Sequence, residues 1–198
     1  IFKQDREVIL VILKAGNIVF DLKSATDEIK DDEEIVRIIV KRNGNDLKHA
    51  SSRLRDHRDL VQSVVSLNGH ALRFASERLR NEKDLVLSAI IKHPFAIKHA
   101  SDRLRSDKQF NIEAGKLNSQ CFMVMSNELK RDQEFLLEAM KEVLPVLKYA
   151  AKSVLGDRGF IIECVKHDSA AFHFASAELQ KDSEILFEAQ LQKRFSAL

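Results

Sequence analysis

A pattern that recurs every 25 residues dominates this 198-residue chain. Four positions of the repeat keep one kind of residue, and we call the set of residues at one such position a column. The first column is large and apolar, the second is mostly Ala, the third is mostly Leu and the fourth is mostly Ser. In that order they are Ile35, Leu60, Leu85, Phe110, Phe135, Phe160 and Ile185; Ala50, Ala75, Ala100, Met125, Ala150 and Ala175; Leu54, Leu79, Leu104, Leu129, Val154 and Leu179; and Ser51, Ser76, Ser101, Ser126, Ala151 and Ser176. A fixed period of this length is typical of stacked repeats, in which each copy buries its apolar side against its neighbours.

Within one copy the apolar spacing is helical. In the second copy, a helix near residues 32–42 places Ile35, Val36, Ile39 and Val40 on one face. A second helix, near residues 46–54, follows the turn residues Asn43-Gly44, and because it is short it can be partly 3₁₀. Asp56, Asn81 and Ser106 stand three residues before an acid or amide, which predicts that they cap the next first helix.

The sequence therefore predicts an all-α solenoid of about eight helix–turn–helix repeats in a single domain over residues 1–198, with the superhelix hand left open. The expected copies are approximately residues 5–30, 31–55, 56–80, 81–105, 106–130, 131–155, 156–180 and a partial copy at 181–198. The first copy begins with a helix over 5–15, which joins the later columns through a two-residue insertion around residues 16–21. Since the chain begins at Ile1 in the middle of the pattern, we interpret it as a piece of a longer protein.

Two strings carry a family resemblance: LRDHRDLVQSVVSLNGHALRFASERL at residues 54–79 and LRNEKDLVLSAIIKHPFAIKHASDRL at residues 79–104. They resemble the tandem repeat known as domain of unknown function 4116, over roughly residues 5–190. The resemblance is weaker in copies five to seven, where Met125 replaces Ala and Leu144-Pro145 replaces Asn-Gly. It implies a repeat scaffold without an assigned activity, and it is compatible with a secreted effector of an intracellular bacterium.

Basic residues in the middle copies are the best candidate for a function. Residues 41–105 hold 14 Lys and Arg against 7 Asp and Glu, a net charge of +7, whereas the whole chain has +2. Stacking would align these cations along the array, where they could contact an acidic protein segment. The candidate partner-binding residues are Lys48, Arg53, Arg55, Arg73, Arg78, Arg80, Lys98, Arg103 and Arg105.

Other interpretations of this charge stay open. The cations can form a solvated face, paired with acids such as Asp56 and Glu82. The repeats can also be a structural or regulatory arm of a larger enzyme or toxin. Nucleic-acid binding is disfavoured, because the chain is nearly neutral and most Phe residues fall on buried columns.

No motif for chemistry is present, so we expect no catalytic residue, no cofactor and no metal site, and no enzyme activity. Cys121 and Cys164 share no motif spacing and are expected to be thiols in a reducing cytosolic compartment, the host cytosol if the protein is a secreted effector. His49 and His99 share a column and are expected to be partly buried. The longest apolar run has six residues, so no membrane insertion is expected.

Overall fold

The structure is a computed structural model that describes residues 5–16 and 20–195. Its described residues form helices and turns, without any strand among them. The chain divides into two compact units, residues 1–104 and residues 105–198. The all-α repeat architecture predicted from the 25-residue period is thus confirmed.

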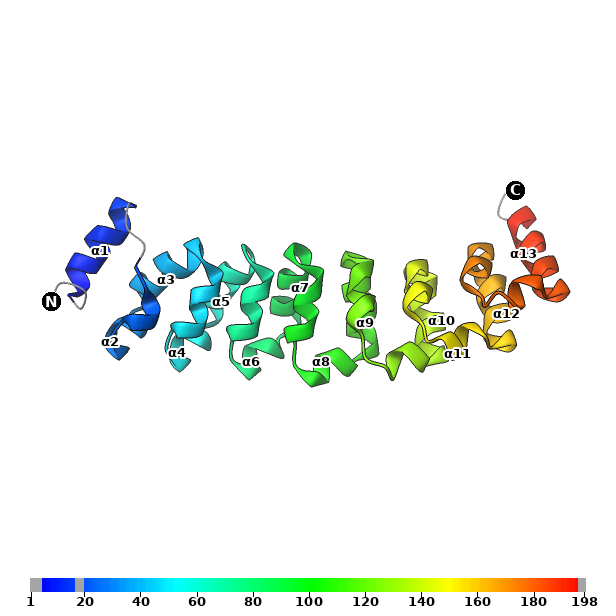
Figure 1. Cartoon of the computed structure of the whole chain (residues 1–198), viewed down its shortest axis with the longest axis horizontal. Helices are drawn as coiled ribbons and strands as arrows, with labels where there is room; N and C mark the ends of the chain where they lie inside the picture. The colour runs from blue at the N-terminus through cyan, green and yellow to red at the C-terminus, as the bar shows by residue number, and fades with distance from the viewer. Residues whose placement is uncertain (1–4, 17–19, 196–198) are drawn as a thin grey trace. The chain divides into compact units, whose positions relative to one another are not determined.

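The first unit contains four successive copies of one arrangement, the first of which begins with α1 (Arg6–Ala15) (Figure 1). Each copy has a main α-helix, then a 3₁₀ helix, then a short α-helix. The elements are η2 (Leu22–Ser24), α2 (Asp27–Lys30), α3 (Glu33–Arg42), η3 (Gly44–His49), α4 (Ser52–Arg55), α5 (Arg58–Val65), η4 (Gly69–Phe74), α6 (Glu77–Arg80), α7 (Lys83–Lys92), η5 (Pro94–His99) and α8 (Asp102–Ser106), within which the second unit begins.

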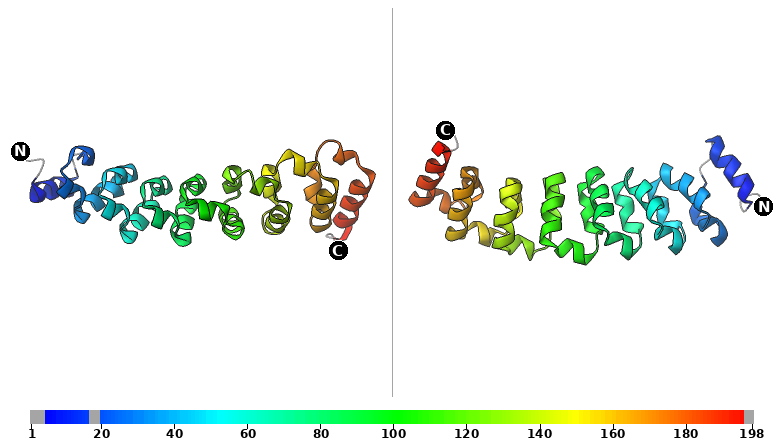
Figure 2. Two further views of the ribbon diagram at one scale, coloured as in Figure 1. Left: turned by 90° about the horizontal axis from the view of Figure 1, so that it is seen from below. Right: turned by 180° about the vertical axis from the view of Figure 1, so that it is seen from behind.

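The main helices of the first unit lie side by side, because each buries the same apolar face against the next (Figures 1 and 2). Ile35, Leu60 and Leu85, from α3, α5 and α7, are all completely buried. The 3₁₀ helices η2 to η5 also contact one another in order, and each short helix buries one large apolar side chain: Ile29, Leu54, Leu79 and Leu104. Equivalent residues therefore meet equivalent surroundings in successive copies, as the period predicted.

The expectation of a continuous second helix at residues 46–54 was wrong. The structure has η3 over Gly44–His49 and α4 over Ser52–Arg55, separated by an extended Ala50 with φ −68° and ψ 157°. The Ser51 side chain accepts a hydrogen bond from the Leu54 amide at 3.2 Å and so begins a new helix. The small-residue columns thus mark a break between two short helices, which a helical period of apolar residues does not reveal.

The predicted capping residues were also displaced by one position. The side chains of Asp32, His57 and Asp107 accept from the third residue of the following helix, the last at 2.8 Å from the Phe110 amide. Asp56 instead ends α4. The reason is that this position bonds to the next copy, as described below.

The second unit repeats the arrangement with less regular short helices (Figure 1). Its elements are α9 (Lys108–Leu117), η6 (Ser119–Val124), η7 (Leu129–Arg131), α10 (Gln133–Glu142), η8 (Leu144–Tyr149), α11 (Lys152–Leu155), α12 (Arg158–His167), η9 (Ser169–Phe174), η10 (Leu179–Lys181) and α13 (Ser183–Phe195). Phe110, Phe135 and Phe160 are buried at the main-helix column. Ala114, Ala139 and Cys164, at equivalent positions of α9, α10 and α12, are completely buried.

The predicted insertion around residues 16–21 falls partly on residues 17–19, which lie outside the described residues. Its neighbours are defined. α1 ends at Gly16, whose φ of 81° is left-handed and suits a residue without a side chain.

Candidate partner-binding surface

One column of predicted binding residues joins neighbouring copies. Arg53 Nε donates to Asp31 Oδ1 at 3.0 Å, and its terminal nitrogen donates to the Asp31 carbonyl at 2.7 Å. Arg78 makes the same two bonds to Asp56, at 3.0 and 2.9 Å. Arg103 Nε donates to the Asn81 side chain at 2.9 Å.

A serine completes each of these connections. The hydroxyls of Ser51 and Ser76 donate to Asp31 and Asp56, and their backbone amides donate to the carbonyls of Lys30 and Arg55. We call this Asp/Asn–Ser–Arg arrangement the inter-repeat clip. Hydrogen bonds from Ser76, followed by those from Arg78, lower the pKa of the Asp56 carboxyl below its ordinary value of 3.8. Arg53, Arg78 and Arg103 thus have a structural role in the first unit.

A second predicted column is half-buried. Arg55 and Arg80 each hold an Nε atom that is buried without a hydrogen-bond partner. Arg80 does reach the neighbouring copy, since a terminal nitrogen donates to the His99 carbonyl at 3.4 Å. Neither guanidinium has a carboxylate at ion-pair distance among the described residues. Arg105 belongs to the second unit and is exposed.

The remaining three predicted residues, Lys48, Arg73 and Lys98, are exposed on η3, η4 and η5. Within the described part of the chain, no carboxylate lies within ion-pair distance of any of them. Arg73 instead donates to the Asn45 side chain at 3.3 Å. Since η3, η4 and η5 contact one another in order, these cations form a row, and the three helices include one acid, Asp46.

Aromatic rings accompany this row. The Arg73 guanidinium lies 4.4 Å from the ring centre of Phe74, and Lys98 Nζ lies 5.5 Å from that of Phe95. Both rings are partly buried, so they hold the cations outward on an apolar support. We define the basic 3₁₀ face as Lys48, Arg73 and Lys98 together with His70, His93 and His99, which lie among them.

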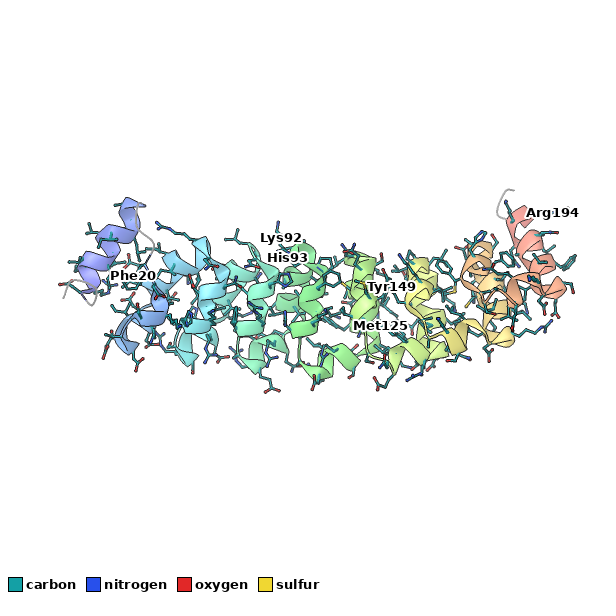
Figure 3. The ribbon with its side chains drawn as sticks, in the orientation of Figure 1. Phe20, Lys92, His93, Met125, Tyr149 and Arg194 are labelled. Carbon is teal, nitrogen blue, oxygen red and sulfur yellow. The ribbon has the colours of Figure 1, made fainter. Side chains whose placement is uncertain are left out.

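These histidines form a cluster that the sequence did not predict. The rings of His70 and His93 stack with centroids 4.7 Å apart, and His99 meets His70 edge-on at 6.3 Å. Figure 3 places His93 beside Lys92 at the C-terminal end of α7. Burial, followed by the nearby charge of His93, Arg73 and Lys98, lowers the pKa of His70 below 6.5. Burial and then His70 lower that of His99.

The cluster escaped sequence reasoning because its members occupy three different columns of the repeat. Of the three histidines, His99 was the one expected to be partly buried. Its equivalent in the earlier copy, His49, carried the same expectation, and both side chains are partly buried. One signal was present: the 3₁₀ helices η4 and η5 belong to successive copies and pack against each other, which brings positions 70 and 93 together. The number of residues between these two positions does not by itself predict the contact.

Cavities elsewhere are small or open. One of about 230 Å³ is lined by clip residues that include Arg78, Asn81 and Arg103. Another of about 450 Å³ lies between α10 and α12, where Gln133 and Gly159 stand. At the equivalent positions Lys108 pairs with Glu134 at 3.0 Å and Arg158 pairs with Glu184, so the groove occurs where this bridge is missing.

Other chemistry is not gathered at one place. The described residues contain no group of three or more His, Cys, Asp or Glu side chains arranged to hold a metal ion. Cys121 and Cys164 are buried, and burial raises the pKa of each thiol to about 12. None of the described helices is both long and apolar enough to cross a bilayer.

Comparison with known families agrees with this repeat. The family described as Domain of unknown function (DUF4116) matches residues 5–55, 32–80, 57–105, 82–130 and 157–198. These windows cover well over half of the chain, and the ends of the first four advance by one 25-residue repeat each time. The chain therefore belongs to this family of tandem helical repeats. No curated protein and no solved structure gave a significant match.

Proposed function

We propose that this protein is a non-catalytic interaction module, and that the basic 3₁₀ face of its first unit binds an acidic segment of a partner protein. The observation that carries the proposal is the difference between two sets of cations. Arg53 and Arg78 are bonded to Asp31 and Asp56, whereas the row of Lys48, Arg73 and Lys98 has no carboxylate partner among the described residues. Cations that are not neutralised by a carboxylate remain available to an acidic ligand.

Charge beneath the face supports the same proposal. The half-buried guanidinium of Arg80 reaches the carbonyl of His99 and has no counter-ion among the residues described. In a partly buried position its field is screened less than that of an exposed lysine. An acidic ligand on the face would compensate this charge together with the exposed row.

The repeat also sets the spacing of the ligand. Neighbouring packed helices lie ~8–10 Å apart, and a polyproline II segment advances ~3.1 Å per residue with about three residues per turn. Every third side chain of such a segment lies on the same side, so an acidic residue at every third position would match Lys48, Arg73 and Lys98 in turn. A regular run of acids at a different spacing would match them less well.

The test uses a fluorescein-labelled 15-residue peptide with Glu at every third position and Gly or Ser between. We expect it to bind in fluorescence anisotropy, with an affinity that falls as salt rises. The triple variant Lys48→Glu, Arg73→Glu, Lys98→Glu should lose on the order of 10- to 100-fold in affinity, because three attractions become repulsions.

A matched control changes charge by the same amount on the second unit. Lys141, Lys152 and Lys166 are exposed, and their replacement by Glu should leave binding within about twofold. Equal losses in the two triple variants would show that only net charge matters, and the proposed face would then be wrong. Far-ultraviolet circular dichroism of both variants checks that the helices are retained.

A further inference from the structure

The histidine cluster of the basic 3₁₀ face is arranged around a shared centre. His70 is the second residue of η4, His93 directly precedes η5, and His99 ends η5. The stacked pair at 4.7 Å and the edge-on pair at 6.3 Å both include His70, so its ring is the centre of the cluster. Two further imidazoles, from adjacent segments of the next copy, therefore lie against the ring of His70.

Gly69 makes this meeting possible. A Cβ at this position would lie 2.3 Å from the Ala89 carbonyl oxygen of α7 and 3.2 Å from the Cβ of His93. The absence of a side chain lets the start of η4 lie directly against the end of α7. His70, the next residue, is thereby brought over the ring of His93.

The charged groups around His70 are all basic. Its own helix contributes Arg73, η5 contributes Lys98 and His99, and His93 comes from the end of α7. From α6, Arg80 acts on His99. On the η3 side, Arg73 is bonded to the neutral side chain of Asn45. Asp46, the acid of η3, is bonded to Asn43 at 3.2 Å.

We propose that this cluster is a binding site for the phosphoryl group of a phosphorylated serine or threonine in the acidic partner segment. The proposal rests on the proposed function, because the cluster is part of the same face. A carboxylate offers two oxygens and one charge, whereas a phosphoryl group offers three terminal oxygens and a charge of about −1.5 to −2 at pH 7. The larger acceptor matches three imidazoles beside Arg73 and Lys98.

Binding at this site is linked to protons. A phosphoryl dianion favours the charged imidazolium, so the complex takes up protons that the unliganded cluster releases. Affinity for the phosphorylated ligand therefore rises as pH falls from 8 towards 6.5. A glutamate ligand gains less over this interval, because its single charge compensates less of the added positive charge.

The experiment compares three peptides with Glu at every third position that differ at the centre, which holds Ser, Glu or phosphoserine. At pH 6.5 the phosphoserine peptide should bind about fivefold or more tightly than the central-Glu peptide. His70→Asn should remove this advantage, so that the variant binds the phosphoserine and central-Glu peptides with affinities within about twofold of each other. His167→Asn, an exposed histidine of α12, is the matched control and should keep the advantage.

The outcomes separate the two proposals. If the central-Glu peptide depends on Lys48, Arg73 and Lys98 but phosphoserine brings no gain, the phosphoryl site is wrong and the acidic-segment function stands. If neither peptide binds, the proposed function itself fails. A phosphoserine advantage that persists in both His70→Asn and His99→Asn would overturn the site, and tighter binding of 15-mer oligo(U) than of the phosphoserine peptide would reassign the face to RNA.

Discussion

Arg73 and Arg78 are five residues apart in one repeat, and they have different roles because their surroundings differ. Arg78 is fixed by Asp56 of the preceding copy, and Arg73 lies over Phe74 without a carboxylate partner. In three successive copies both columns are basic: Lys48, Arg73 and Lys98 form one, and Arg53, Arg78 and Arg103 form the other. The clip therefore depends on one arginine column, and the exposed charge depends on another.

A serine of the clip provides a test of its contribution to stability. Ser76 donates to Asp56 and accepts from the Leu79 amide at 3.2 Å. Ser76→Ala removes a helix cap and an inter-repeat bond, and we expect a loss of about 1–2 kcal/mol in the free energy of unfolding. Urea denaturation followed by circular dichroism measures it.

Ser153→Ala is the matched control for that substitution. Ser153 is exposed on α11, so its loss should change the unfolding free energy by less than about 0.5 kcal/mol. Indistinguishable urea midpoints for the two variants would mean that the clip contributes nothing to stability.

At this scale the sequence predicted which residues are equivalent but not where they point. The buried column of Leu60 and Leu85 was correct, because an apolar side chain repeated at one position must share a core. The candidate surface was only partly resolved, since a period cannot tell Arg53, held in a clip, from Lys48, exposed to solvent. That distinction needs the break at Ala50-Ser51, which sets the direction of the side chains on either side.

Among the elements, the 3₁₀ helices decide the character of the surface. A 3₁₀ helix has three residues per turn, so Lys98 and Phe95, three apart in η5, lie on the same side. An α-helix would separate them by 60°. The expectation of one continuous second helix did not separate this 3₁₀ turn from the short α-helix that follows it, so the Lys98–Phe95 pair could not be anticipated from the spacing of the repeat.

Gly69 provides a prediction for the contact between η4 and α7. Gly69→Ala places a Cβ 2.3 Å from a backbone oxygen that cannot move freely, and we expect a loss of about 1–3 kcal/mol in unfolding free energy. The stacking of His70 on His93 should weaken as well. Thermal unfolding and the histidine ring resonances in NMR spectra report the two effects.

The opposite result is expected for a glycine with space around it. Gly159 lies in the first turn of α12, and a Cβ there would meet its nearest atom, Asp157 Oδ1, at 3.5 Å. Gly159→Ala should raise the unfolding free energy by about 0.5–1 kcal/mol, since alanine loses less entropy in a helix. If both substitutions stabilise the protein, the close approach of η4 to α7 is wrong.

For the whole molecule, the shifted groups predict how stability depends on pH. His70 and His99 have pKa values below 6.5 in the folded state, so the unfolded chain binds more protons as the pH falls through that value. Stability should therefore decrease below about pH 6.5. Asp31 and Asp56, with pKa values below 3.8, add a second decrease when the clip carboxylates become protonated.

Urea midpoints measured between pH 8 and pH 3 test this dependence. The double variant His70→Asn, His99→Asn should flatten the first decrease and leave the second in place. A midpoint that rises between pH 7 and pH 5.5 in the unmodified protein would contradict the assigned direction of the histidine shifts.

The inter-repeat clip has a consequence for how such chains change over evolutionary time. Asp56 is bonded to Ser76 and Arg78, all within 22 positions, and the Arg55 carbonyl to the Ser76 amide within 21. Each contact joins residues that are fewer than 25 positions apart. Duplication or deletion of a whole 25-residue copy at the gene level therefore creates a new junction with equivalent donors and acceptors. Unequal recombination can thus lengthen or shorten the protein by single copies, and neither product leaves an orphaned carboxylate behind.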